Sequence, residues 1–197
     1  MTKKQKEDKK KKNRTAVFWV LGLGTAGVIG YQVFKHKKGS SSSGSSTNNS
    51  TTGLYSGGRG LRNNNPLNLI NTSINWQGEV PFSQKQDADF EEFTSPFYGI
   101  RANLLNFYNY LGSSGMKLED IIWRWANGTK GAKPQPYIDF VVSNTRFNPT
   151  TVITRNINYQ DLWAIFRAMA IFENGSKFQP EVNNLESDFS RAFDNLN

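Results

Sequence analysis

The chain of 197 residues contains no cysteine and a single histidine, His36. A thiol nucleophile, a Ser-His-Asp triad and a zinc site of His or Cys ligands therefore have no residues to use. His36 also lies in a basic stretch outside the region that we expect to fold. The chemistry that remains is that of carboxylates, and we expect neither a metal nor a cofactor.

Excess positive charge is missing from most of the chain, although the formal net charge is +8. Residues 1–14 carry eight Lys or Arg, and three more Lys lie in residues 35–38, so that residues 39–197 have a net charge of −1. The globular part has no basic face from which counterions of a phosphate backbone would be released. We therefore expect no nucleic-acid partner.

Charged residues are also absent from residues 15–34, a stretch of about twenty residues that is long enough to cross a hydrocarbon core of roughly 30 Å. Trp19 and Tyr31 suit the two interfaces of a membrane helix. The positive-inside rule places residues 1–14 in the cytoplasm and residues 39–197 across the membrane. A cleaved signal peptide is the alternative, but no clear small-residue cleavage site follows the apolar stretch.

Small residues are frequent both within this apolar stretch and in the segment that follows it. Gly22, Ala26 and Gly30 fall at four-residue spacing, a ridge that could pack one membrane helix on another, although glycine is common in such helices. Residues 35–58 are basic and then rich in Ser, Gly, Thr and Asn, which is typical of a flexible linker. Residues 59–197 then form one domain of ordinary size.

The domain has the pattern of a mainly α protein (α+β) with a small β element. Two aromatic-rich stretches, residues 74–82 and 89–94, are separated by polar residues and predict a β-hairpin. Ser95 is a candidate N-cap with Pro96 at the first helical position. Apolar periodicity predicts helices over residues 96–111, 118–125, 136–144, 160–173 and 185–196.

The helix over residues 160–173 has little polar face, and we therefore expect it to be buried. Glu173 stands at its end, beside apolar groups and close to the negative pole of the helix dipole, and both effects favour the protonated acid. A carboxyl that stays neutral near pH 7 can protonate a glycosidic oxygen. Alternatively, Glu173-Asn174-Gly175 is only a helix C-cap.

Several uncommon strings occur in order within residues 59–180. They are Arg62-Asn63-Asn64-Asn65-Pro66 followed by Asn68, Trp76-x-Gly78, Phe90 with Phe93, Gly99-Ile100-Arg101-Ala102, Ile121-Ile122-x-Arg124-Trp125-Ala126, Tyr137-Ile138, and Ala170-x-x-Glu173-Asn174-Gly175. Together they resemble a family of phage and prophage virion-associated lysins that includes the lysis enzyme of an enveloped double-stranded RNA phage. The resemblance implies a lysozyme-like domain that degrades peptidoglycan.

These strings supply the candidate substrate-binding residues, Arg62, Asn64, Asn65, Asn68, Trp76 and Tyr137. Asparagine amides bind sugar hydroxyls and N-acetyl groups, but they equally shape turns through bonds to the main chain. Trp76 is the best candidate for a sugar platform, and a place in the core is its alternative. Arg62 could pair with a core carboxylate or meet the acidic peptide stem.

A weaker similarity links the chain to bacterial N-acetylglucosaminidases of the flagellar-hydrolase type. Their catalytic Glu-Ser-Gly motif precedes the part that resembles residues 66–95, whereas Glu173-Asn174-Gly175 follows it here, as in a circular permutation. The similarity implies that Glu173 is the general acid. It also implies a second carboxylate from the hairpin, either Glu79 or Glu92, with Asp89 and Glu91 as further candidates.

The chain departs from the lysin pattern at Leu67, where family members usually have glycine, and it lacks the Glu-Asn pair that usually follows Trp-Ala-Pro. We expect a membrane-anchored phage peptidoglycan hydrolase of the muramidase, lytic transglycosylase or glucosaminidase type, with its domain outside the cytoplasm, in a virion membrane or the host inner membrane. The alternatives are a catalytically inactive structural protein of the virion membrane and an endopeptidase that cleaves the peptide bridge.

Overall fold

The computed structural model describes residues 58–128 and 130–196. The expected basic tail, the membrane helix with its small-residue ridge and the linker, over residues 1–57, lie outside this described part. Within it, no helix has both the length and the apolar character needed to cross a bilayer.

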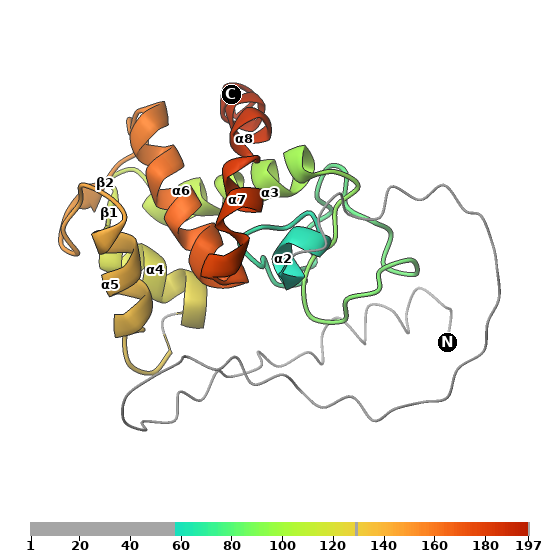
Figure 1. The fold of residues 1–197 in the computed structure, drawn as a ribbon, viewed down its shortest axis with the longest axis horizontal. Helices are drawn as coiled ribbons and strands as arrows, with labels where there is room; N and C mark the ends of the chain where they lie inside the picture. Colours follow the sequence, from blue (N-terminus) through green and yellow to red (C-terminus); the bar gives the residue numbers. More distant parts are fainter. Residues whose placement is uncertain (1–57, 129, 197) are drawn as a thin grey trace.

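Most of the described chain is helical, as the apolar periodicity predicted (Figure 1). The elements are, in chain order, α2 (Arg59–Arg62), α3 (Pro96–Leu111), β1 (Met116–Lys117), α4 (Leu118–Asn127), α5 (Gln135–Ser143), β2 (Val152–Ile153), α6 (Tyr159–Asn174), the 3₁₀ helix η1 (Ser176–Phe178), α7 (Gln179–Asn183) and α8 (Glu186–Asp194). The predicted helices all form, within a few residues of their expected ends. The short helices α2 and α7 were not predicted, because four or five residues contain too few turns to show a period.

Local sequence signals set the ends of α3. Ser95 has an extended backbone at the N-cap, and Pro96 follows as the first helical residue, where its fixed φ suits the helix. Gly112 ends the helix with a φ of 55°. Both predicted boundaries of this helix are therefore confirmed.

Helix α6 is the centre of the core, and its predicted burial is confirmed. The buried side chains of this helix are Leu162, Ile165, Phe166, Ala168, Met169, Ala170, Ile171 and Asn174. Helices α2, α5, α7 and α8 all contact α6, and α3 packs against α8. The C-terminal end of α6 meets α2 (Figure 1). It therefore lies beside residues 63–68, which follow α2 and are called the Asn-rich turn below.

The small sheet is not where the sequence predicted it. Strands β1 and β2 pair in antiparallel register, Met116 with Ile153 and Lys117 with Val152. A strand of two residues shows at most one change from an apolar to a polar side chain, which is too little to be recognised as a strand pattern in the sequence. The pairing also joins segments separated by a helical pair, a contact that only the tertiary structure can show.

Of the expected hairpin over residues 74–94 only one isolated bridge is present, Glu79 with Phe93, and a second bridge joins Phe90 to Ile70, which lies before the expected hairpin. Side chains take main-chain N–H groups that a regular ladder would use. The Asp87 carboxylate accepts from the N–H groups of Asp89 and Phe90. Such local side-chain bonds compete with strand pairing, and the prediction of two continuous strands is therefore wrong.

Helix α3 comes into very close contact with the Asn-rich turn at Gly99. A Cβ atom at Gly99 would lie 1.6 Å from the main-chain oxygen of Asn64. Real carbon atoms do not approach an oxygen so closely, so only glycine fits at this crossing. The contact gives a packing reason for the glycine in the string Gly99-Ile100-Arg101-Ala102.

Candidate functional site

The Asn-rich turn is held by its own amides. Asn65 is fully buried, and its Nδ2 donates to the main-chain oxygens of Leu69 and Glu91, at 2.9 Å each. Asn64 is also buried, and its Nδ2 donates to the oxygen of Phe93 at 2.8 Å. These bonds give both residues a role in shaping the turn. A direct contact of either with a glycan stays a prediction.

Leu67 does not need the glycine that the lysin pattern has at this position. The non-glycine residues with positive φ in the described chain are Asn64, at 51°, and Asn68, at 53°. Asparagine tolerates this left-handed region better than most residues. Leu67 can therefore bury its side chain, which is 1% exposed, while the two asparagines turn the backbone.

Three side chains from the helices fasten the turn to the core. Asn103 on α3 accepts from the N–H of Leu67 at 3.1 Å, and the Nε1 of Trp125 on α4 donates to the oxygen of Leu67 at 2.8 Å. Asn174 on α6 accepts from the N–H of Leu61 at 3.0 Å and donates to the oxygen of Pro66 at 2.8 Å. The turn is thus fixed relative to the C-terminal end of α6.

Glu173 lies at that end of α6, next to Asn174. The Nδ2 of Asn68 donates to its carboxylate oxygen Oε2 at 3.0 Å. Burial raises the pKa of Glu173 to about 7, and hydrogen bonds from the side chains of Asn68 and Tyr137 oppose that rise. The carboxyl is therefore poised between its acid and base forms near neutral pH.

Tyr137 reaches Glu173 from α5. Its ring is 3% exposed and stacks on Phe172, with ring centroids 4.0 Å apart and planes inclined by 14°. Its side chain hydrogen-bonds to the Glu173 carboxyl. The structure thus brings together three predicted site residues, Glu173, Asn68 and Tyr137, from α6, the Asn-rich turn and α5.

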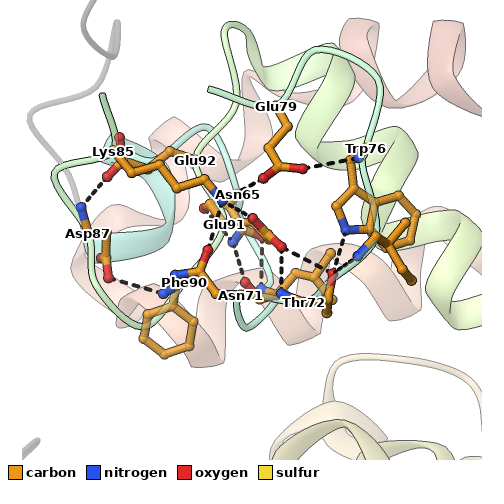
Figure 2. A network of polar contacts seen from close by, with 12 residues as sticks. Asn65, Asn71, Thr72, Trp76, Glu79, Lys85, Asp87, Phe90, Glu91 and Glu92 are labelled. Atoms are coloured by element: carbon orange, nitrogen blue, oxygen red, sulfur yellow. Dashed lines mark hydrogen bonds and ion pairs between the residues drawn. The ribbon is translucent and has the colours of Figure 1, made fainter. Parts of the chain in front are cut away.

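The predicted hairpin carboxylates belong to a different cluster, which Figure 2 shows. The Nζ of Lys85 contacts Glu79 at 2.8 Å and also pairs with Glu91, while Asn71 accepts a third bond from it at 2.8 Å. The Lys85 side chain is 2% exposed and Glu91 is fully buried. Burial raises the pKa of Glu91, and the ion pair with Lys85 opposes this.

Glu92 and Asp89 also have partners in this region. The Glu92 carboxylate accepts from the main-chain N–H of Asp87, and Arg59 bridges Asp87 and Asp89 at 2.6 and 2.9 Å. Burial alone would raise the pKa of Asp87, but hydrogen bonds from Arg59 and Asn63 lower it to about 2. In the described residues, none of the hairpin carboxylates acts on the pKa of Glu173.

Trp76 lies at the edge of a small apolar cluster. It is partly buried against Leu69, Phe93 and Ala102, and its Nε1 donates to the hydroxyl of Thr72 at 3.2 Å. One edge of the ring is therefore packed while the residue keeps some exposure, and its role as a sugar platform stays a prediction. Arg62 is exposed, and its contact with a peptide stem stays a prediction.

Sequence reasoning missed Asn103 and Lys85, and it took Asn174 only as part of a motif or a helix cap. Asn174 and Asn103 are buried polar side chains on apolar helices, and Lys85 is a buried cation. A polar residue within a buried helical face was the available signal for the two asparagines. No signal marked Lys85, because its partners lie in a loop without a period.

A separate cavity of about 190 Å³ lies at the other end of α6, where Ile153, Asn158 and Asp161 contribute to its lining. Asp161 is twelve residues from Glu173 along the same helix, or about 18 Å at 1.5 Å per residue. The cavity therefore has no part in the chemistry at Glu173. In the described residues, no group of three or more His, Cys, Asp or Glu could hold a metal ion.

The fold and the site define the class of protein: a small, mainly α-helical domain with a partly buried, weakly acidic carboxyl at the end of its central helix. No protein-family model matches the chain. The chain is 37% identical over 131 residues to Protein P5 of Pseudoalteromonas phage PM2, which covers 64% of this chain and 76% of the phage protein. The chain therefore belongs to the family of this phage protein. The expected phage relationship is confirmed, whereas the finer expectation of a lysin stays a prediction.

Proposed function

We propose that this phage protein is a peptidoglycan hydrolase that cleaves glycan strands with Glu173 as its general acid. The observation that carries the proposal is the pKa of about 7 for a carboxyl at the end of a buried helix. A general acid works best when its pKa lies near the working pH, because the proton is then both present and transferable. Side chains with strongly shifted pKa values concentrate at functional sites.

The contacts of the hairpin carboxylates favour a mechanism that needs only one acid. Glu79 and Glu91 are paired with Lys85, and Glu92 is bound to a main-chain N–H. A retaining glycosidase would need a second carboxylate about 5 Å from the first, and an inverting one would need it somewhat farther away. Neither arrangement is supported by the contacts of the described residues.

A single carboxyl can serve both halves of such a reaction. Glu173 first gives its proton to the glycosidic oxygen as the bond from the anomeric carbon breaks, and the leaving sugar departs as an alcohol. The Glu173 carboxylate then accepts the proton of the hydroxyl that attacks the anomeric carbon. That hydroxyl comes from the sugar itself, as in lytic transglycosylases, or from water. The first route leaves an anhydro sugar end and the second a reducing end.

Digestion of purified sacculi by the full chain in detergent tests this proposal. Mass spectrometry of the soluble products distinguishes anhydro ends, reducing ends and newly freed peptide amines. We expect anhydro or reducing glycan ends from the wild type and at least a roughly 10²-fold lower yield from Glu173→Gln, which keeps the shape but cannot transfer a proton. Freed peptide amines would support the endopeptidase alternative instead. No product from a folded wild type would support the inactive structural protein.

The proposal includes a membrane anchor. Residues 15–34 would hold the domain at a membrane and the linker would let it reach the cell wall, with an r.m.s. span on the order of 25 Å for about twenty flexible residues. This placement rests on the sequence. A domain tethered to a membrane suits an enzyme that opens the cell wall locally, during entry or lysis, better than an enzyme that diffuses away.

A further inference from the structure

We propose that Asn68 is a positioning residue that holds the Glu173 carboxyl in one orientation, rather than a ligand of the substrate. The inference rests on the proposed function of Glu173 and assigns the side chain that prepares it. The bonds of Asn68 to Glu173 support it, whereas its buried Oδ1 atom and its positive φ are shared with Asn64.

The Asn68 amide is directed at two oxygens of the same residue. Its Nδ2 donates to Glu173 Oε2 at 3.0 Å and lies 3.4 Å from the main-chain oxygen of Glu173. Both neighbours are acceptors, so only the nitrogen of the amide can face them. The bonds join residues 105 positions apart in the sequence and fix the carboxyl relative to the last turn of α6.

This orientation leaves Oδ1, the other end of the amide, without a hydrogen bond. Asn68 Oδ1 is buried and has no hydrogen-bond partner among the described residues. A buried acceptor without a donor costs free energy, and most such atoms in folded proteins are paired. Asn65 satisfies both ends of its amide on the main chain of Leu69, whereas the Oδ1 of Asn64 is unpaired like that of Asn68.

The backbone of Asn68 is also unfavourable, with a φ of 53°. Asn64 shares both features, a positive φ and a buried Oδ1 without a partner, while its amide binds Phe93 within the turn. What distinguishes Asn68 is the direction of its Nδ2 toward Glu173. The contact with Glu173 is therefore what this side chain provides beyond the turn.

Asn68 is half-buried, and the engagement of its amide makes a direct role in binding sugar less suitable. Its Nδ2 is already engaged with Glu173, and its Oδ1 is enclosed, so that neither end of the amide is offered to a ligand. Tyr137 on α5 is the titratable side chain of the described residues that acts on the same carboxyl. Asn68 and Tyr137 therefore both act on the Glu173 carboxyl.

The matched pair Asn68→Gly and Asn64→Gly isolates this role. Both positions have nearly the same positive φ, which glycine adopts without strain, and both substitutions remove an amide whose Oδ1 is buried and unpaired. Only the amide of Asn68 reaches Glu173, because that of Asn64 binds Phe93. We would follow the titration of Glu173 by NMR, in the full chain in detergent with ¹³C-labelled glutamate, and assign its signal with Glu173→Gln.

Loss of a donor to the carboxylate disfavours the charged form and raises the pKa. We expect the Glu173 midpoint to rise by about one pH unit in Asn68→Gly, a tenfold change in the acid dissociation constant, and to stay unchanged in Asn64→Gly. The alkaline limb of sacculus cleavage should move in the same direction, with a lower rate at the optimum because the carboxyl is no longer held.

An unchanged midpoint in folded Asn68→Gly would overturn the proposal, and so would an equal rise in Asn64→Gly, which would show an effect of the turn as a whole. If Asn68→Gly does not fold, Asn68→Asp provides a second test, because its ionised side chain cannot donate and should raise the midpoint further. The NMR titration needs no activity. A wild type that cleaves nothing would therefore refute the proposed function while the titration still decides the role of Asn68.

Discussion

Replacing Glu173 by glutamine should stabilise the protein at alkaline pH while it removes activity. The carboxyl has a pKa of about 7 in the folded chain and an ordinary value of 4.5 when unfolded. The folded state thus binds the proton more tightly than the unfolded state. Ionisation of Glu173 costs stability progressively as the pH rises above 4.5, and the full cost is reached above pH 7.

The size of this cost follows from the difference between the two pKa values. At 1.36 kcal/mol for each pH unit the penalty would be about 3 kcal/mol, and partial exposure of the residue reduces it to about 2 kcal/mol. Glutamine does not ionise. Glu173→Gln should therefore match the wild type in unfolding free energy at pH 4 and exceed it by about 2 kcal/mol at pH 9.

Urea unfolding of the full chain in detergent, followed by tryptophan fluorescence at pH 4, 7 and 9, measures this difference. Other titrating groups are common to both proteins and cancel in the comparison. A constant difference between the two proteins across this pH range would refute the reasoning, because the pKa of Glu173 would then be the same in the folded and unfolded states. A wild type that becomes relatively more stable at pH 9 would refute it as well.

Three further predictions concern the scaffold and the topology. Lys85→Met leaves two glutamates without their buried cation and should lower the unfolding free energy by about 3–5 kcal/mol at pH 8, whereas Lys133→Met, at an exposed ion pair, should change it little; equal effects in urea titrations would contradict the buried network. Gly99→Ala should prevent folding or lower the melting temperature strongly, because its Cβ would meet a main-chain oxygen, while Gly128→Ala, with open space around it, should cost about 1–2 kcal/mol. Protease added outside spheroplasts of an expressing cell should digest residues 59–197, and protection of the domain would reverse the expected orientation.

The amino-acid sequence alone predicted the parts of the domain whose signals lie within one element. Apolar spacing gave the long helices, Ser95, Pro96 and Gly112 gave the ends of α3, and the lack of a polar face gave the burial of α6. The direction of the pKa shift of Glu173 was also predicted, because the apolar helix that it ends indicates burial, and burial disfavours a charge. The helix periods depend on neighbours three or four residues away.

The tertiary structure decided which side chains surround that carboxyl. Asn68 meets Glu173 across 105 positions, and the hairpin carboxylates turn instead toward Lys85 and main-chain N–H groups. The two-residue strands of the sheet likewise find each other across two helices. Periodicity describes a single element and contains no information on which loop folds against it. Contacts between distant segments form only when the whole core packs. Which segments meet depends on the space that the rest of the core leaves to fill and on the hydrogen-bond donors and acceptors that are still unpaired.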